Sequence, residues 1–193
     1  MPPSSQGRHS LDHAAIPVQS RGDSPDTRTA GEESVGRPDA LVRFNTASGG
    51  AAEAALLACC GSHRWALRLA AHRPYPDVAA LLAAADEASY DLSAADLAEA
   101  LSGEASADLH HSAPQAAHTA LRAAHAAYES RFGHAFVICL DAVRPTEQLD
   151  QLLAGIRSRL ANERDEERAV TADELRRLAR GRLARLVGDR PES

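Results

Sequence analysis

Aromatic residues are scarce in this sequence, at 4% of 193 residues, although hydrophobic residues together make up 44%. A packed core is therefore feasible, but it has to consist mainly of Leu and Ala. Ala and straight-chain residues favour helices, whereas the β-branched and aromatic residues that suit strands are few. The composition predicts an all-α fold.

Cysteine is also rare, and the three residues are Cys59, Cys60 and Cys139. Two of them are adjacent and the total is odd, so they form neither a disulfide framework nor a CxxC zinc pattern. We interpret all three as small buried residues.

The sequence lacks both an excess of basic residues and a long apolar run. Its formal net charge is −6, so nucleic acid is not an expected partner. No apolar run approaches the ~20 residues that span a membrane. The start, Met1-Pro2-Pro3-Ser4, has no apolar signal-peptide core, so we expect a cytoplasmic protein that contacts no membrane.

The familiar catalytic motifs are missing as well: there is no Walker loop, GxGxxG, GxSxG or HExxH.

His118 and His125 fall on one predicted helix, about 10.5 Å apart along its axis, which is too far for joint chelation of a metal. His110 and His111 lie in a predicted loop, where histidines are usually solvated. We expect no metal site.

Two regions differ in composition. Residues 1–40 are rich in Pro, Gly, Ser, Arg and Asp without an apolar period, and we expect a disordered tail. Residues 41–188 are expected to form a single compact domain of about seven helices. Capping residues and prolines predict helix starts near Thr46 or Ser48, Ser62, Pro76, Asp91 or Ser93, Pro114, Pro145 and Thr171.

Two stretches interrupt this helical pattern. The short apolar run 135–140 follows Gly133, and periodicity cannot decide between a strand and an extended buried segment. The run Asp165-Glu166-Glu167 breaks the apolar pattern with charge, so the last helix is predicted only from about Thr171 to Val187.

Arg182 is the most informative candidate site residue. At about 100° per residue, it shares a narrow arc with Leu175, Ala179 and Leu186, near the centre of the predicted apolar stripe. A guanidinium there keeps its charge and needs an anionic partner. Either it pairs with a buried Asp or Glu, or snorkels along its stem, or it clamps an anionic ligand such as a carboxylate.

The order and spacing of several motifs resemble those of the 2-oxo-4-hydroxy-4-carboxy-5-ureidoimidazoline (OHCU) decarboxylases. The resemblance covers about residues 41–187. The motifs are Phe44-Asn45, Cys59-Cys60-Gly61-Ser62, Trp65, Arg73-Pro74-Tyr75, Tyr128-Glu129-Ser130-Arg131-Phe132-Gly133-His134-Ala135-Phe136, Arg159-Leu160-Ala161-Asn162 and Arg182-Leu183.

The resemblance implies an all-helical, usually dimeric and cofactor-free enzyme that makes (S)-allantoin in urate breakdown. A small-molecule ureide substrate and a homodimer are therefore the expected partners. Substrate contacts are implied at Arg182 and in the segment after Arg-Phe-Gly, which comprises Phe136, Val137, Ile138, Cys139 and Leu140.

The sequence departs from the family where the proton donor is expected. Family members carry a catalytic His in an H-P-x-x-G motif and a later Glu-Gln pair, but this chain reads Ser102-Gly103-Glu104-Ala105-Ser106 and has no such pair. One hypothesis is an active decarboxylase whose acid is His110, His111, His118 or Glu104. The others are a non-catalytic relative, which binds a ureide or scaffolds a purine-degradation enzyme, and a decarboxylase for another carboxylated heterocycle.

Overall fold

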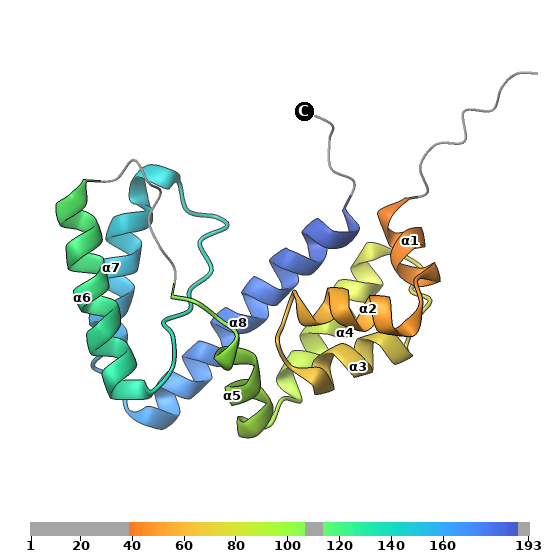
Figure 1. Cartoon of the computed structure of the whole chain (residues 1–193), viewed down its shortest axis with the longest axis horizontal. Helices are drawn as coiled ribbons and strands as arrows, with labels where there is room; N and C mark the ends of the chain where they lie inside the picture. Colours follow the sequence, from red (N-terminus) through yellow and green to blue (C-terminus); the bar gives the residue numbers. More distant parts are fainter. Residues whose placement is uncertain (1–38, 107–113, 189–193) are drawn as a thin grey trace, which may run out of the picture. The chain divides into compact units, whose positions relative to one another are not determined.

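The computed structural model describes residues 39–106 and 114–188. These residues form eight α-helices and one 3₁₀ turn and include no strand, which confirms the all-α prediction (Figure 1). Nearly all of the predicted tail, 1–38, lies outside the described residues, as do His110 and His111. In the described part of the chain, no helix is long and apolar enough to cross a membrane.

The first five helices begin at short polar capping residues. Their bounds are α1 Ala40–Thr46, α2 Gly49–Leu57, α3 His63–Ala71, α4 Val78–Tyr90 and α5 Ala94–Ser102. The predicted caps Ser48, Ser62 and Ser93 are confirmed, since each side chain accepts a hydrogen bond from a backbone N–H in the first turn. The sequence prediction missed α1, which Asp39 caps by accepting from the Leu41 N–H.

From the sequence, Gly61 predicts a helix end just after Cys60, but α2 ends earlier. The helix stops at Leu57 rather than at Cys60, because the backbone N–H groups of Cys59 and Cys60 both donate to the carbonyl of Leu56 in a closing turn. Gly61 follows and lies against α5, where a Cβ would come within 3.2 Å of the Ala100 carbonyl oxygen. This glycine therefore permits close contact between two backbones.

Helices α1 to α5 enclose a large apolar cluster together with part of the last helix. Trp65 of α3 is its largest member and is fully buried, with its indole N–H donating to the Ala85 carbonyl at 3.0 Å. Leu69 and Leu81 are buried beside it in the same cluster. Trp65 and Leu69, four residues apart in the sequence, thus lie on the same inward side of α3.

A smaller apolar cluster lies between α6 Gln115–Phe132 and α7 Gln148–Arg159, which follows the 3₁₀ turn Pro145–Glu147. The α6 helix ends at Gly133, whose φ of 82° suits a residue without a Cβ, and glycine is the residue type that commonly ends a helix in this way. Residues 135–140 form no strand and have no regular secondary structure. Phe136 and Val137 of this segment are buried.

The last helix, α8, runs from Arg164 to Val187, so its predicted start near Thr171 was wrong. Its acidic first turn is part of the helix, and Glu167 is fully buried. The buried residues recur every fourth position and are Glu167, Thr171, Leu175, Ala179, Leu183 and Val187.

The spacing of these buried residues explains how one helix serves both clusters. A four-residue step exceeds a helical turn by about 40°, so the buried face winds around α8 along its length. It meets Arg159 of α7 at Glu167, and the helix packs on α4 and α1 further along. Leu186 is 39% exposed, and Arg182 lies beside the buried face rather than at its centre, which corrects the predicted stripe.

Candidate functional site

Arg182 forms a two-pronged ion pair with Glu104, which follows the end of α5. The Nη1 and Nη2 atoms lie 2.6 and 2.8 Å from the two carboxylate oxygens, and Nη1 also donates to the Cys59 carbonyl at 3.1 Å. Hydrogen bonding to Glu104 raises the pKa of Arg182 above its ordinary value. The anionic partner of this guanidinium is thus a carboxylate of the chain itself. This is the predicted alternative in which Arg182 pairs with a buried Asp or Glu.

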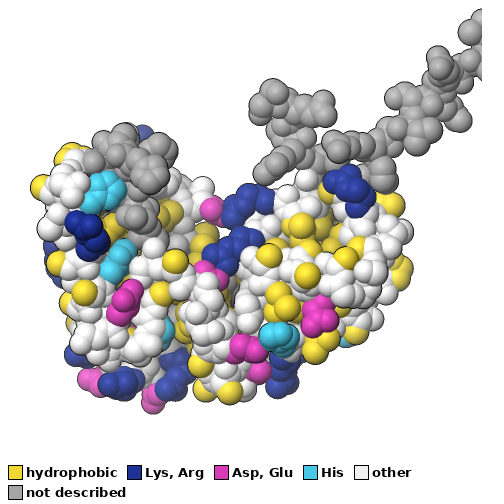
Figure 2. Space-filling model, in the orientation of Figure 1, with side chains coloured by type: hydrophobic (Ala, Val, Ile, Leu, Met, Phe, Trp, Pro, Cys, Tyr) yellow, Lys and Arg dark blue, Asp and Glu magenta, His cyan; other side chains and the backbone are white. Residues whose placement is uncertain are grey.

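The surroundings of this pair are only partly open to solvent. The Glu104 side chain is 9% exposed and that of Arg182 is 31% exposed. In the space-filling view, basic and acidic side chains lie next to each other near the middle of the face shown (Figure 2). The Coulomb attraction between two charges shielded in this way is stronger than on an open surface, because water screens it less.

The two cysteines next to this pair are unreactive thiols. Cys59 and Cys60 are buried, as predicted, whereas the prediction was wrong for Cys139, which is only half-buried. Burial raises the pKa of Cys59, and it raises that of Cys60 to about 11. Because only the thiolate is a good nucleophile, neither residue suits covalent catalysis.

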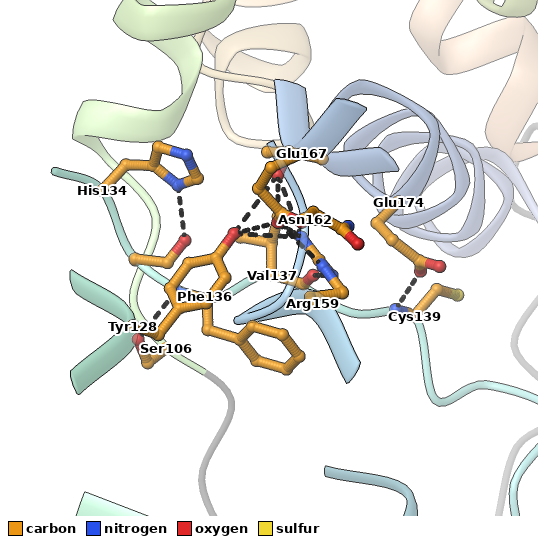
Figure 3. Close-up of polar contacts among 12 residues, drawn as sticks. Ser106, Tyr128, His134, Phe136, Val137, Cys139, Arg159, Asn162, Glu167 and Glu174 are labelled. Carbon is orange, nitrogen blue, oxygen red and sulfur yellow. Dashed lines mark hydrogen bonds and ion pairs between the residues drawn. The ribbon is translucent and has the colours of Figure 1, made fainter. Parts of the chain in front are cut away.

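Three polar side chains hold the segment 136–140 in place (Figure 3). The Phe136 N–H donates to Ser106 Oγ at 3.0 Å, and the Cys139 N–H donates to Glu174 Oε2 at 2.8 Å.

The Val137 carbonyl in the same segment accepts a hydrogen bond from Arg159 Nη1 at 2.7 Å. The side chains of Phe136 and Val137 face the core, whereas Ile138, Cys139 and Leu140 are half-buried. A ligand contact from this segment therefore has to come from its second half or from backbone groups that remain available.

A buried polar network, missed by the sequence analysis, supports this segment. Arg159 donates to Glu167 Oε1 from Nε at 2.8 Å and from Nη2 at 2.6 Å, and to Thr171 Oγ1 at 2.9 Å. Tyr128 donates a short hydrogen bond to Glu167, and Asn162 donates to its other oxygen at 2.8 Å. No local sequence signal pointed to this network, because Glu167 joins the four-residue repeat of buried positions only once α8 is known to begin at Arg164.

The network shifts the proton affinities of its members. Burial favours the neutral form of Glu167, but hydrogen bonds from Arg159 and Tyr128 and the arginine charge outweigh it, so the pKa is lowered. Burial and the hydrogen bond to Glu167 raise the pKa of Tyr128 to about 12. At neutral pH the network therefore holds one buried ion pair and a neutral phenol.

A cavity of about 720 Å³ lies beside Glu104. It is bounded by one side of α5, the end of α6 and the first turns of α8. Its polar lining consists of Ser102, Glu104, Ser106, Glu129, His134, Arg164, Arg168 and Thr171.

The predicted site residues relate to this cavity in different ways. Glu104 lines it, and Arg182 lies behind Glu104. Ala135 lines it, but Phe136–Leu140 and His118 do not. The sequence shows His134 only as part of a motif, and the fold places it on the wall of the cavity. Within the described residues, no group of three or more His, Cys, Asp or Glu is placed to hold a metal ion.

The fold resembles that of two proteins with solved structures. A crystal structure of (S)-allantoin synthase matches with a TM-score of 0.62 and 16% identity over 78% of this chain. A crystal structure of OHCU decarboxylase in the presence of (S)-allantoin matches with a TM-score of 0.59 and 22% identity over 69% of this chain and 96% of that one. This chain spans only 54% of the allantoin synthase chain.

The sequence model of the OHCU decarboxylases matches residues 45–105 and 102–184, so the chain belongs to the OHCU decarboxylase family. This is a family of carboxy-lyases. The two matched segments overlap at 102–105, the stretch that contains Glu104. A comparison with curated protein sequences gave no match.

Proposed function

We propose that the chain is a cofactor-free carboxy-lyase that converts OHCU to (S)-allantoin. Family membership over most of the chain supports this activity. The observation that carries the proposal is the pairing of both Arg182 nitrogens with a carboxylate at the edge of a cavity. A guanidinium in this geometry recognises a planar carboxylate, whichever molecule supplies it.

In this proposal, the anionic group of the substrate binds Arg182 at the place that the Glu104 carboxylate occupies in the structure. Substrate binding replaces one charge-assisted pair by another, so Arg182 keeps an anionic partner throughout. Arg182 positions the substrate, but an interaction that is equally strong in the ground state and in the transition state does not accelerate the reaction. Acceleration requires that the electron pair left by CO₂ enters the conjugated ring and that a proton arrives on one face.

The direct test uses the purified full chain and freshly generated OHCU. The substrate is made in the cuvette from urate by urate oxidase and hydroxyisourate hydrolase, and circular dichroism follows the chirality of allantoin. We expect rapid formation of the (S) enantiomer. Racemic allantoin formed at the uncatalysed rate would rule out the activity.

A non-catalytic relative that binds a ureide or scaffolds a purine-degradation enzyme is the second candidate. One observation favours it: residues 101–106 contain no histidine. Calorimetric titration with (S)-allantoin distinguishes the ureide-binding protein from the scaffold. Binding without turnover indicates a ureide-binding protein, whereas neither binding nor turnover leaves the scaffold.

We also propose that the chain is a homodimer, which rests on the family resemblance alone, and that it is cytoplasmic, as its composition leads us to expect. Analytical ultracentrifugation of the full chain tests the assembly, and a single species at the monomer mass over micromolar concentrations would contradict it.

A further inference from the structure

His134 has a fixed orientation on the wall of the cavity. It follows Gly133 at the end of α6, and its ring lies edge-on to Tyr128, with centroids 5.6 Å apart at an interplanar angle of 76° (Figure 3). Its Nδ1 atom lies 3.0 Å from the Ala135 carbonyl oxygen. A carbonyl can only accept, so Nδ1 carries a hydrogen and the exchangeable proton of the ring is the one on Nε2.

The other acid–base groups on this wall already have partners. Glu104, from the loop after α5, pairs with Arg182, and Glu129 of α6 accepts from Ser106 Oγ at 2.8 Å. The charged groups that α8 contributes to the cavity are Arg164 and Arg168, which carry no proton that can be lost near neutral pH.

His134 Nε2 makes no hydrogen bond within the described residues. Of the groups on this wall, His134 is thus the one best suited to exchange a proton with a ligand.

We propose that His134 is the catalytic acid of this chain, an inference that rests on the proposed decarboxylase function. The bond from the ring carbon to the carboxylate breaks, CO₂ leaves, and the electron pair stays on the ring system. The Nε2–H of the imidazolium then forms the new C–H bond, which leaves a neutral product and a neutral imidazole. The imidazole regains its proton from water that enters the open cavity.

The position of His134 gives this step its stereochemistry. A donor fixed on one wall protonates one face of a bound ring, whereas water protonates both faces. Loss of the donor should therefore affect the chirality of the product even when CO₂ is still released. Replacing a residue with a purely structural role would change the rate or the stability. It would not make the product racemic while CO₂ is still released.

The test compares His134→Gln and His134→Asn with the parent chain. Release of CO₂ and the enantiomeric excess of allantoin are measured in parallel from pH 5 to 9, after thermal melts confirm folding. We expect the rate of allantoin formation to fall by about 10²- to 10⁴-fold, as for loss of a general acid. The product should become racemic, and the decline in rate as the imidazole loses its proton should disappear.

His72→Gln is the matched control, because His72 also places Nδ1 against a backbone carbonyl, that of Arg68 at 2.7 Å, but lies at the end of α3 away from the cavity. It should leave rate and chirality unchanged. An active parent chain whose His134 variants keep the (S) excess and the pH profile would overturn only the role of His134. A parent chain that does not accelerate CO₂ release would overturn the decarboxylase function and this role with it.

Discussion

At the residue scale, the pair Arg159–Glu167 is the charged contact most shielded from solvent among the described residues, with side chains 8% and 1% exposed. Each member is expensive to bury alone, so removing one leaves the other as an uncompensated charge. We expect Glu167→Gln to lower the free energy of unfolding by about 3 kcal/mol. Chemical denaturation measures the loss. The neighbouring Glu166→Gln, on the exposed side of α8, should stay within about 0.5 kcal/mol of the parent.

The same carboxylate predicts a pH dependence of stability. The pKa of Glu167 is lowered in the folded chain, so the unfolded chain binds its proton more readily. Its contribution is therefore complete above the ordinary carboxyl pKa and is lost as the pH falls through the lower, folded value. Asp96, whose pKa is lowered by hydrogen bonds from Ser93, acts in the same direction.

Unfolding curves from pH 7 down to pH 3 should show a loss of stability that is shallower in Glu167→Gln than in the parent. Equal slopes for the two chains would mean that Glu167 does not titrate with folding.

Glu104 allows a prediction about ligand affinity. As long as its carboxylate pairs with Arg182, it competes with any carboxylated ligand for the same two nitrogens. We expect Glu104→Gln to bind a carboxylated ureide about 10- to 150-fold more tightly, since a charge-assisted contact is worth roughly 1.5–3 kcal/mol. Calorimetric titration measures the change.

Glu99→Gln is the control for this substitution, because Glu99 is also on α5 but pairs with the exposed His63. An unchanged or weaker affinity in Glu104→Gln alone would mean that Glu104 belongs to the ligand site rather than competing with the ligand.

At the scale of elements, the sequence was informative where a local rule decides the structure. The caps Ser48, Ser62 and Ser93 and the terminator Gly133 act through backbone groups within a few residues, so the sequence could reveal them. The start of α8 could not be found in this way. Glu167 looks like a surface residue until Arg159 from another helix neutralises it.

The candidate site shows the same limit. The need of Arg182 for an anion followed from its charge, but the identity of Glu104 depended on how α5 meets α8. His134 reached the cavity wall through packing that no local pattern encodes.

Contact between elements also makes Gly61 a sensitive position. A Cβ there would meet the Ala100 backbone at 3.2 Å, and a backbone cannot rotate away as a flexible side chain does. We expect Gly61→Ala to shift α5 and to lower the free energy of unfolding by about 1–3 kcal/mol. Because α5 leads to Glu104, ligand affinity should change as well.

The comparison for this variant is Gly50→Ala in α2. No atom lies within 4 Å of a Cβ at that position, so the substitution should stabilise the chain by about 0.5–1 kcal/mol through helix propensity. Thermal melts of both variants show whether each substitution stabilises or destabilises the chain. A stabilised Gly61→Ala chain would show that α5 can move away without cost.

At the scale of the whole described domain, the two apolar clusters differ greatly in size. The cluster around Trp65 draws on α1 to α5, on α8 and on Val137, whereas the cluster around Tyr128 contains buried residues only from α6, α7 and the segment that joins them. The second cluster is linked to α8 through the polar network of Arg159, Glu167 and Thr171. Stability that rests on fewer apolar contacts is lost first in local unfolding.

We therefore expect native-state hydrogen exchange to show two levels of protection. Amides near Leu152 in α7 should exchange through partial opening, whereas those near Leu69 and Leu81 should exchange only on global unfolding. Glu167→Gln should widen the difference, because it weakens the link to α8 without removing an apolar contact of the larger cluster. If α3 and α7 lost protection together at every denaturant concentration, the described helices would unfold as one cooperative unit, and the polar network would be as strong a connection as the apolar core.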